Sequence, residues 1–68
     1  MTQAITVNGE AAPLEVTTVA ELLAARGVNG QRGVAVALND AVVPRPQWPQ
    51  ARLQPGDRVE IIKVVGGG

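Results

Sequence analysis

The order of apolar and polar residues along the chain first predicts a β-hairpin. Residues 4–7 (AITV) alternate with period two, as a half-buried strand does, and Asn8-Gly9 is a strong hairpin signal. The alternation resumes at residues 14–16 (LEV), so we expect the second strand there, after a connection loosened by residues 10–13. Pro13 fits a loop or a strand edge, because it lacks the N–H that a central ladder needs.

A helical pattern follows at residues 18–27 (TVAELLAARG). Thr18 and Glu21 have the spacing of a capping box, in which each satisfies a free backbone N–H of the other. Gly27 stands where a left-handed residue commonly ends a helix. Val19, Leu22 and Leu23 form an apolar stripe at helical spacing, with Arg26 beyond it. This stripe predicts a short helix of about two and a half turns that packs on a sheet.

The middle of the chain predicts two further strands. Asn29-Gly30 and Gly33 mark a loop, and residues 34–38 (VAVAL) then form a continuous apolar run. Such a run, with small alanines on one face, suits a central strand beneath the helix. Asn39-Asp40 predicts a tight turn into residues 41–43 (AVV), which Pro44 ends.

The next segment is rich in proline and predicts irregular structure. Pro44, Pro46 and Pro49 fix φ and donate no N–H, so we expect at most a single helical turn around Trp48. We interpret Trp48 as a cover on the aliphatic core rather than as a ligand platform. Residues 51–53 form a short strand at most, and residues 54–57 (QPGD) have the order of a type II turn.

The last predicted strand covers residues 59–65 and contains an anomaly. The chain alternates from Arg58 to Ile61, but Ile62 breaks the phase, so that Ile62 and Val64 face away from Val59 and Ile61. Either a β-bulge resets the strand, or its end exposes apolar side chains to solvent. An exposed end would give an apolar docking patch beside the C-terminus, for which the candidate residues are Ile62, Val64 and Val65.

Composition limits the class of protein. A chain of 68 residues is one domain, and 46% hydrophobic against 18% charged residues favours a packed globule over a disordered segment. Six basic and six acidic residues give a formal net charge of zero, which argues against nucleic-acid binding. Neither a membrane span nor a leader pattern stands out, and we expect a soluble cytoplasmic protein.

The chemistry available to the side chains is narrow. The sequence contains no Cys, His, Ser or Tyr, so thiol or hydroxyl nucleophiles paired with His and thiolate or imidazole metal sites are excluded. We therefore expect no metal centre and no side-chain catalytic site. One reactive group remains, the C-terminal carboxylate of Gly68, which follows Gly66 and Gly67. Three extended glycines reach roughly 10 Å into a narrow cleft, although a terminal glycine run is also typical of a frayed end.

Three segments together resemble a known family: residues 18–27 (TVAELLAARG), 38–48 (LNDAVVPRPQW) and 53–68 (LQPGDRVEIIKVVGGG). They are similar to the bacterial sulfur-carrier proteins of thiamine biosynthesis, the ThiS family. The resemblance implies an α+β fold of the β-grasp, ubiquitin-like type. This fold has a mixed four- to five-stranded sheet, in which the first and last strands are adjacent in the middle, and one main helix packs on one face. We expect this domain at residues 1–65 and a flexible glycine tail at residues 66–68.

The resemblance also implies a function at the C-terminus. A ThiF-like adenylating enzyme uses ATP to activate the carboxylate of Gly68, to which Gly66 and Gly67 are the flexible lead. Sulfur supplied by a donor system such as a cysteine desulfurase then gives a thiocarboxylate, which a ThiG-like thiazole synthase consumes. The carrier itself is expected to hold no bound cofactor.

One departure and three alternatives stay open. The family usually ends in two glycines, so Gly67 carries the activated carboxylate if the third glycine is not native. The small subunit of molybdopterin synthase, or another thiocarboxylate carrier, shares the fold and the chemistry. A ubiquitin-like modifier would instead attach its glycine to lysine side chains. A plain interaction domain would have no use for the tail.

Overall fold

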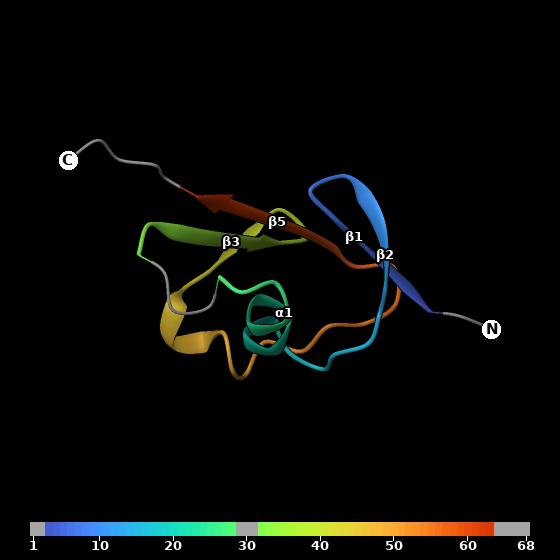
Figure 1. Ribbon diagram of the computed structural model, residues 1–68, viewed down its shortest axis with the longest axis horizontal. Helices are drawn as coiled ribbons and strands as arrows, with labels where there is room; N and C mark the ends of the chain where they lie inside the picture. Colours follow the sequence, from blue (N-terminus) through green and yellow to red (C-terminus); the bar gives the residue numbers. More distant parts are fainter. Residues whose placement is uncertain (1–2, 29–31, 64–68) are drawn as a thin grey trace.

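The computed structural model describes residues 3–28 and 32–63, which form one five-stranded sheet and one α-helix (Figure 1). The elements in chain order are β1 (Ala4–Val7), β2 (Glu10–Pro13), α1 (Val19–Ala25), β3 (Val34–Leu38), β4 (Ala41–Val43), the 3-10 helix η1 (Arg45–Gln47) and β5 (Arg58–Lys63). The strand order is β2-β1-β5-β3-β4, and β1 and β5 are parallel. The first and last strands are therefore neighbours in the middle of a mixed sheet, which confirms the predicted β-grasp arrangement.

The first hairpin is tighter than predicted. β2 begins at Glu10, and Val7 pairs with Glu10 across the two-residue turn Asn8-Gly9. Both turn residues have positive φ, 52° and 83°, as a type I′ turn requires. The predicted second strand at residues 14–16 was wrong, because a two-residue turn brings the chain into register at once. Pro13 lies in the edge strand β2, as expected for a residue without an N–H.

The helix begins as predicted. The backbone N–H of Glu21 donates to Thr18 Oγ1 at 3.2 Å, and Glu21 Oε1 accepts from the backbone N–H of Thr18 at 3.3 Å. Gly27 has φ of 75° just after the C-cap residue Arg26. The seven residues of α1 make about two turns, slightly fewer than predicted.

The hydrophobic core lies between α1 and one face of the sheet. Figure 1 places α1 beneath the sheet, and all three residues of the predicted stripe are buried. The opposing strand residues alternate toward the helix and are likewise buried: Ile5, Val7, Val34, Val36 and Val59. Among the described residues, the other face of the sheet carries no helix.

The proline-rich segment completes the core. Pro44 ends β4, and η1 leads into Trp48, whose side chain is only 4% exposed. Its indole N–H donates to the backbone oxygen of Val43 at 2.8 Å, and the Arg45 guanidinium lies 4.6 Å from the ring centroid. The prediction that Trp48 covers the aliphatic core is confirmed.

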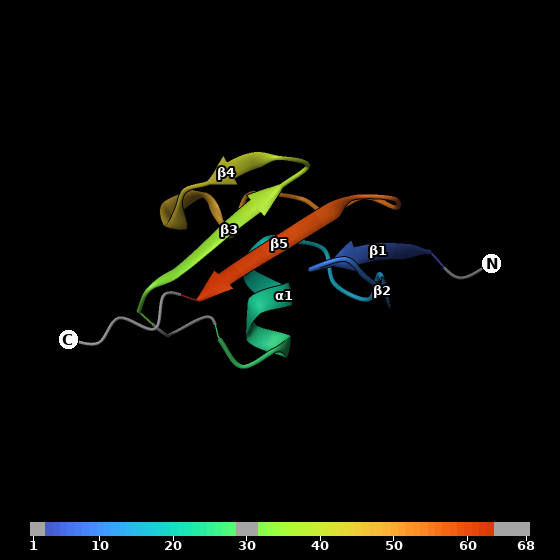
Figure 2. The same cartoon turned by 90° about the horizontal axis from the view of Figure 1, so that it is seen from above.

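The chain then returns to the middle of the sheet. Arg52 forms an isolated bridge with Thr18, so residues 51–53 make less than a full strand. Gly56 has φ of 86°, and the backbone N–H of Asp57 donates to Gln54 O at 3.1 Å, as in the predicted type II turn. β5 follows directly and runs between β1 and β3 (Figure 2).

Candidate functional site

The candidate site is the end of β5, the strand that leads to the C-terminus. Lys63, the last residue of β5, pairs with Val34 at the start of β3. On the other side, the last pair with β1 is Val7 with Val59, so β5 continues four residues beyond β1. Figure 2 shows β5 running past the hairpin of β1 and β2 to the end of the sheet. Five predicted site residues lie outside the described residues: Val64, Val65, Gly66, Gly67 and Gly68.

The anomaly in β5 is an exposed apolar side chain. The pairing of β3 with β5 runs residue by residue from Leu38 with Val59 to Val34 with Lys63, so no bulge interrupts these pairs. Val59 is buried and Ile61 half-buried, whereas Ile62 is 55% exposed on the opposite face. Of the two alternatives for this strand, apolar exposure to solvent is therefore the one that the described residues adopt.

Ile62 belongs to a wider apolar area on the outer face of the sheet. Ala35 pairs with Ile62 across β3 and β5, and Ala37 pairs with Val42 across β3 and β4, which puts all four on that face. Val42 is 77% exposed. We call these residues the outer patch: Ala35, Ala37, Val42 and Ile62. The patch includes Ile62 of β5, the strand that leads to the C-terminus, and the exposed Glu60, which pairs with Ala37, adds a charge to the same face.

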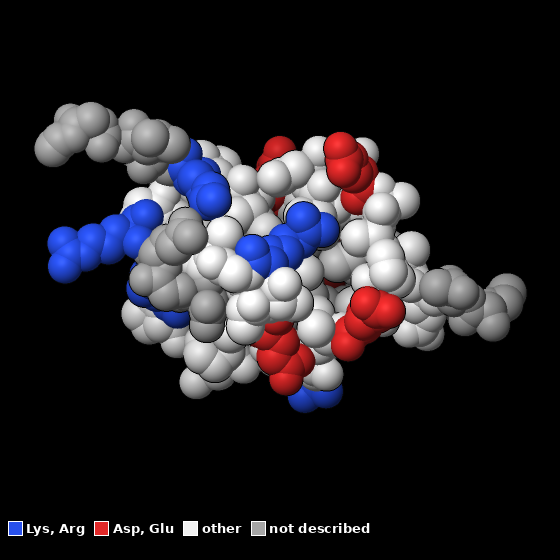
Figure 3. Space-filling model, in the orientation of Figure 1, with Lys and Arg blue, Asp and Glu red and all other residues white. Residues whose placement is uncertain are grey.

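Charged side chains are distributed unevenly along the molecule. On the face drawn in Figure 3, basic side chains gather toward the end at which β5 finishes, and acidic side chains lie mostly over the other half. Lys63 is at that end, paired with Val34. A net charge of zero thus conceals a lengthwise asymmetry, which can orient a charged partner during encounter.

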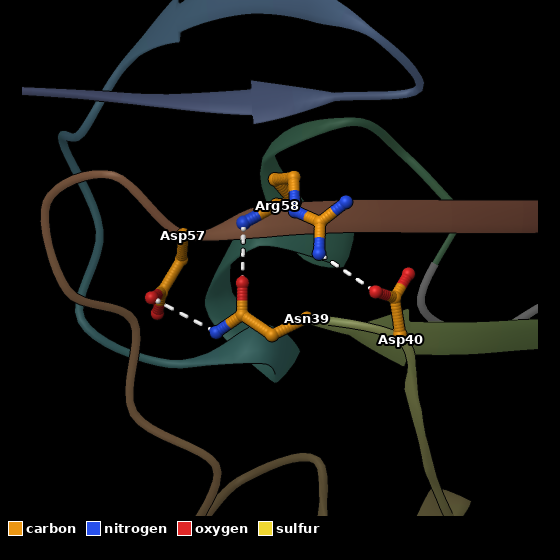
Figure 4. A network of polar contacts seen from close by, with 4 residues as sticks. All are labelled: Asn39, Asp40, Asp57 and Arg58. Atoms are coloured by element: carbon orange, nitrogen blue, oxygen red, sulfur yellow. Dashed lines mark hydrogen bonds and ion pairs between the residues drawn. The ribbon is translucent and has the colours of Figure 1, made fainter.

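The start of β5 is fixed by a polar network (Figure 4). Asn39 Oδ1 accepts from the backbone N–H of Arg58 at 2.9 Å, and Asn39 Nδ2 donates to Asp57 Oδ1 at 3.1 Å. Asp57 Oδ2 also accepts from the backbone N–H of Gln54 at 2.9 Å. The ion pair between Arg58 and Asp40 spans 2.7 Å, but both side chains are more than half exposed, so it adds little stability.

A second asparagine contacts β5 nearer its end. Asn8 Oδ1 accepts from the backbone N–H of Ile61 at 2.8 Å, and Asn8 Nδ2 donates to the backbone oxygen of Ile61 at 3.3 Å. Sequence reasoning used Asn8 and Asn39 only as turn signals and missed these contacts. An Asn at the first position of a type I′ turn, beside a strand that continues past the turn, is the signal that could have indicated these hydrogen bonds to β5.

The described body offers little room for a small molecule. An open hollow of about 220 Å³ lies between β2 and α1, lined mainly by apolar residues such as Ala12, Val16 and Leu22. Another of about 160 Å³ lies beside β5 and includes Arg58 and Glu60. Both are smaller than the pockets that usually enclose a metabolite, so the chain end remains the stronger candidate for chemistry.

The described part of the chain contains neither a cluster of metal-binding side chains nor a membrane-spanning helix. Residues 3–28 and 32–63 contain no group of three or more Asp and Glu side chains placed to hold a metal ion. No helix in the same residues has the length and apolar character to cross a membrane.

Comparison with known proteins identifies the family. The family model of ThiS, described as the ThiS family, matches residues 2–68. The chain belongs to the ThiS family. This family is that of the sulfur carrier proteins of thiamine biosynthesis, so the expectation drawn from the sequence motifs is confirmed at this level.

Individual relatives agree with that assignment. The chain is 40% identical over 62 residues to the sulfur carrier protein ThiS of Thermus thermophilus, covering 91% of this chain and 95% of that protein. The match to ThiS of Escherichia coli is 45% identical over 38 residues and spans 56% of this chain and only 58% of that protein. The crystal structure of ThiS from Geobacter metallireducens has a TM-score of 0.80 at 34% identity, covering 96% of this chain and 99% of that one.

A relative of a different kind is much longer. A thiazole synthase of Paramagnetospirillum magneticum is 35% identical over 65 residues, which cover 94% of this chain but only 20% of that protein. A segment similar to this chain therefore forms about one fifth of a protein named for thiazole synthesis.

Proposed function

We propose that this chain carries sulfur as a thiocarboxylate on its C-terminal Gly68 and delivers it for thiazole formation in thiamine biosynthesis. A ThiF-like enzyme adenylates the carboxylate with ATP, a donor such as a cysteine desulfurase supplies the sulfur, and a ThiG-like thiazole synthase consumes the product. The carrier contributes no catalytic side chain and holds no cofactor. We place the cycle in the cytoplasm, where ATP is available to the activating enzyme.

The reaction sequence balances in two steps. In the first, a carboxylate oxygen attacks the α-phosphorus of ATP, forming the acyl adenylate and releasing pyrophosphate. In the second, a hydrosulfide attacks the acyl carbon, so a C–S bond forms, the C–O bond to AMP breaks, and AMP leaves. If the sulfur arrives as a protein persulfide, the first product is an acyl disulfide, and a thiol reductant must cleave its S–S bond.

The observation that carries the proposal is the family match, which includes the glycine end of the chain. Two features of the molecule support it. The sequence lacks Cys and His, so the chain end is the group most suited to activation by a partner. β5 is held in the middle of the sheet and leads directly to that end, so binding energy from the body can orient the reacting atom.

The longer relative supports one of the proposed partners. In the thiazole synthase of P. magneticum, a segment similar to this chain is covalently joined to the remaining four fifths of that protein. Covalent linkage gives two domains a high effective concentration for each other. We infer that the separate chain meets a thiazole synthase as its sulfur acceptor.

Reconstitution tests the proposal. Purified chain incubated with its cognate ThiF-like enzyme, ATP and a sulfide donor is expected to gain the mass difference between sulfur and oxygen, once per molecule. Omission of ATP is the control and should leave the mass unchanged. High-mass conjugates on lysine would instead identify a protein modifier. Consumption of the thiocarboxylate only by a molybdopterin synthase would assign the other pathway, and no modification at all would identify an inert interaction domain.

We further propose that the ThiF-like enzyme docks on the end of β5, through Ile62 together with Val64 and Val65. Replacing Ile62 by Asp should weaken binding of the activating enzyme by about tenfold, because a charge then enters an apolar contact. Thermal stability should change little, since Ile62 is 55% exposed. Titration calorimetry with the activating enzyme measures the affinity directly.

Val42→Asp is the matched control for Ile62→Asp. Val42 is 77% exposed on the same face but lies on the edge strand β4, two strands away from β5. Its substitution should reduce affinity less than twofold. Equal losses for both variants would show that the enzyme covers the whole outer patch, and an unchanged affinity for Ile62→Asp would refute docking at this residue.

A further inference from the structure

Two asparagines contact β5 in the same way from opposite sides. Asn8 is the first residue of the turn between β1 and β2, and Asn39 is the first residue of the turn between β3 and β4. Both have φ of 52°, and both are followed by a second residue with positive φ. The side-chain oxygen of each accepts a backbone N–H of β5, from Ile61 at 2.8 Å and from Arg58 at 2.9 Å.

Each side chain replaces a backbone group that the turn removes. The backbone N–H of Asn8 donates to Val59 O at 2.9 Å, and a regular parallel ladder would next pair Ile61 N–H with the backbone oxygen of Asn8. The left-handed conformation of Asn8 ends the ladder there, and its amide accepts that N–H instead. The same amide donates to Ile61 O, so both β1-facing backbone groups of Ile61 are bonded to one side chain.

Asn39 does the same at the other end of the strand. Its backbone N–H donates to Arg58 O at 2.8 Å, and an antiparallel pair would return a bond from Arg58 N–H to the backbone oxygen of Asn39. The side-chain oxygen takes that bond. Each asparagine thus extends the sheet ladder by one step through side-chain hydrogen bonds, which we call a side-chain rung. Only the rung of Asn8 lies toward the C-terminal end of β5.

We propose that Asn8 is a positioning residue that fixes the direction of the last residues of β5, from which the chain continues to its glycine end. Ile61 is bonded to β3 through its neighbours and to Asn8 on the β1 side, and it is only two residues before the end of β5. Without the amide, the last residues of β5 would be bonded on the β3 side alone, so the direction of the strand end would be less tightly fixed. This inference rests on the proposed function, because it concerns delivery of the tail to an activating enzyme.

A less tightly fixed end of β5 lowers the rate of the chemical step more than it lowers affinity. The body still docks, but the terminal carboxylate samples a larger volume, so a smaller fraction of complexes has the reacting atoms in place. The substitution of Asn8 should therefore reduce kcat for adenylation and leave KM for the carrier nearly unchanged. This pattern is the reverse of that expected for Ile62→Asp, which removes docking contacts.

The experiment compares Asn8→Gly with Asn39→Gly. Glycine accepts the positive φ of both turns, and each variant loses one side-chain rung on β5. For Asn8→Gly we expect a three- to tenfold loss of kcat, which corresponds to the net free energy of about one to two hydrogen bonds. KM should stay within about twofold of the value for the unsubstituted chain. Asn39→Gly should keep kcat within about twofold. Pyrophosphate release by the cognate activating enzyme supplies both constants for both variants.

Amide hydrogen exchange tests the contact independently of any enzyme. Exchange at Ile61 should accelerate about tenfold in Asn8→Gly and not in Asn39→Gly, whereas Arg58 should show the converse. If Asn8→Gly does not fold, Asn8→Asp replaces it. That variant keeps an acceptor for Ile61 N–H but loses the donor to Ile61 O, so its kcat should lie between those of Asn8→Gly and the unsubstituted chain.

The outcomes separate this inference from the proposed function. Equal losses of kcat in the two glycine variants, a change confined to KM, or unchanged exchange at Ile61 would each overturn the role of Asn8. Failure of the unsubstituted chain to be adenylated would overturn the proposed function, while the exchange result would still decide whether Asn8 holds β5.

Discussion

Deletion of Gly67 and Gly68 is expected to abolish thiocarboxylate formation while leaving the melting temperature within about 2 °C of the full-length value. The chemical effect is large because the reacting carboxylate would move back by two residues, roughly 7 Å of extended chain. The thermal effect is small because glycine contributes no side chain to the core. Intact mass spectrometry after reconstitution and a thermal melt of the same preparation measure both quantities.

Deletion of Gly68 alone is the matched control. It leaves the two-glycine ending that is usual for the ThiS family, so an active single deletion would assign the reactive carboxylate to Gly67. An inactive one would assign it to Gly68. A double deletion that keeps full activity would refute the tail as the site, and one that melts far lower would show that the tail is structural.

Replacement of Trp48 by Ala should cost about 3–5 kcal/mol in the free energy of unfolding. Trp48 is 4% exposed, lies in the core cluster and donates its indole N–H to Val43 O, so the change removes both packing and a hydrogen bond. A domain of this size has a stability of only about 3–10 kcal/mol. The variant should therefore lose a large part of its stability, and urea denaturation followed by circular dichroism measures the loss.

Val42→Ala is the control for this truncation. Val42 is 77% exposed, so shortening its side chain should change the free energy of unfolding by less than about 0.5 kcal/mol. A cost below about 1 kcal/mol for Trp48→Ala would mean that this residue does not belong to the core, and its interpretation as a ligand platform would have to be reconsidered.

Features set by short-range chemistry were predictable from the sequence. The capping box of Thr18 and Glu21, the positive φ of Gly27 and Gly56, and the end of β4 at Pro44 all follow from residue type and spacing. The burial of the helical stripe followed from its periodicity. The parallel pairing of β1 with β5 joins distant segments, and it was reached only through resemblance to a family.

Other features depend on three-dimensional context. β2 forms from Glu10 to Pro13 because the tight turn forces this segment beside β1, although two alanines and a proline are poor strand formers. Pattern alone could not choose between a bulge and solvent exposure at Ile62, because both fit the same sequence. The contacts of Asn8 with Ile61 join residues 53 positions apart, so their register had to be known first.

The most direct measurement is the mass of this protein isolated from its native host, with fragmentation of its C-terminal peptide. We expect a fraction of molecules in which one oxygen is replaced by sulfur, with the sulfur on the last glycine. This fraction should disappear when the gene for the activating enzyme is deleted. A C-terminus that is always an unmodified carboxylate, during active thiamine synthesis and with the activating enzyme present, would contradict the role of this chain as a sulfur carrier.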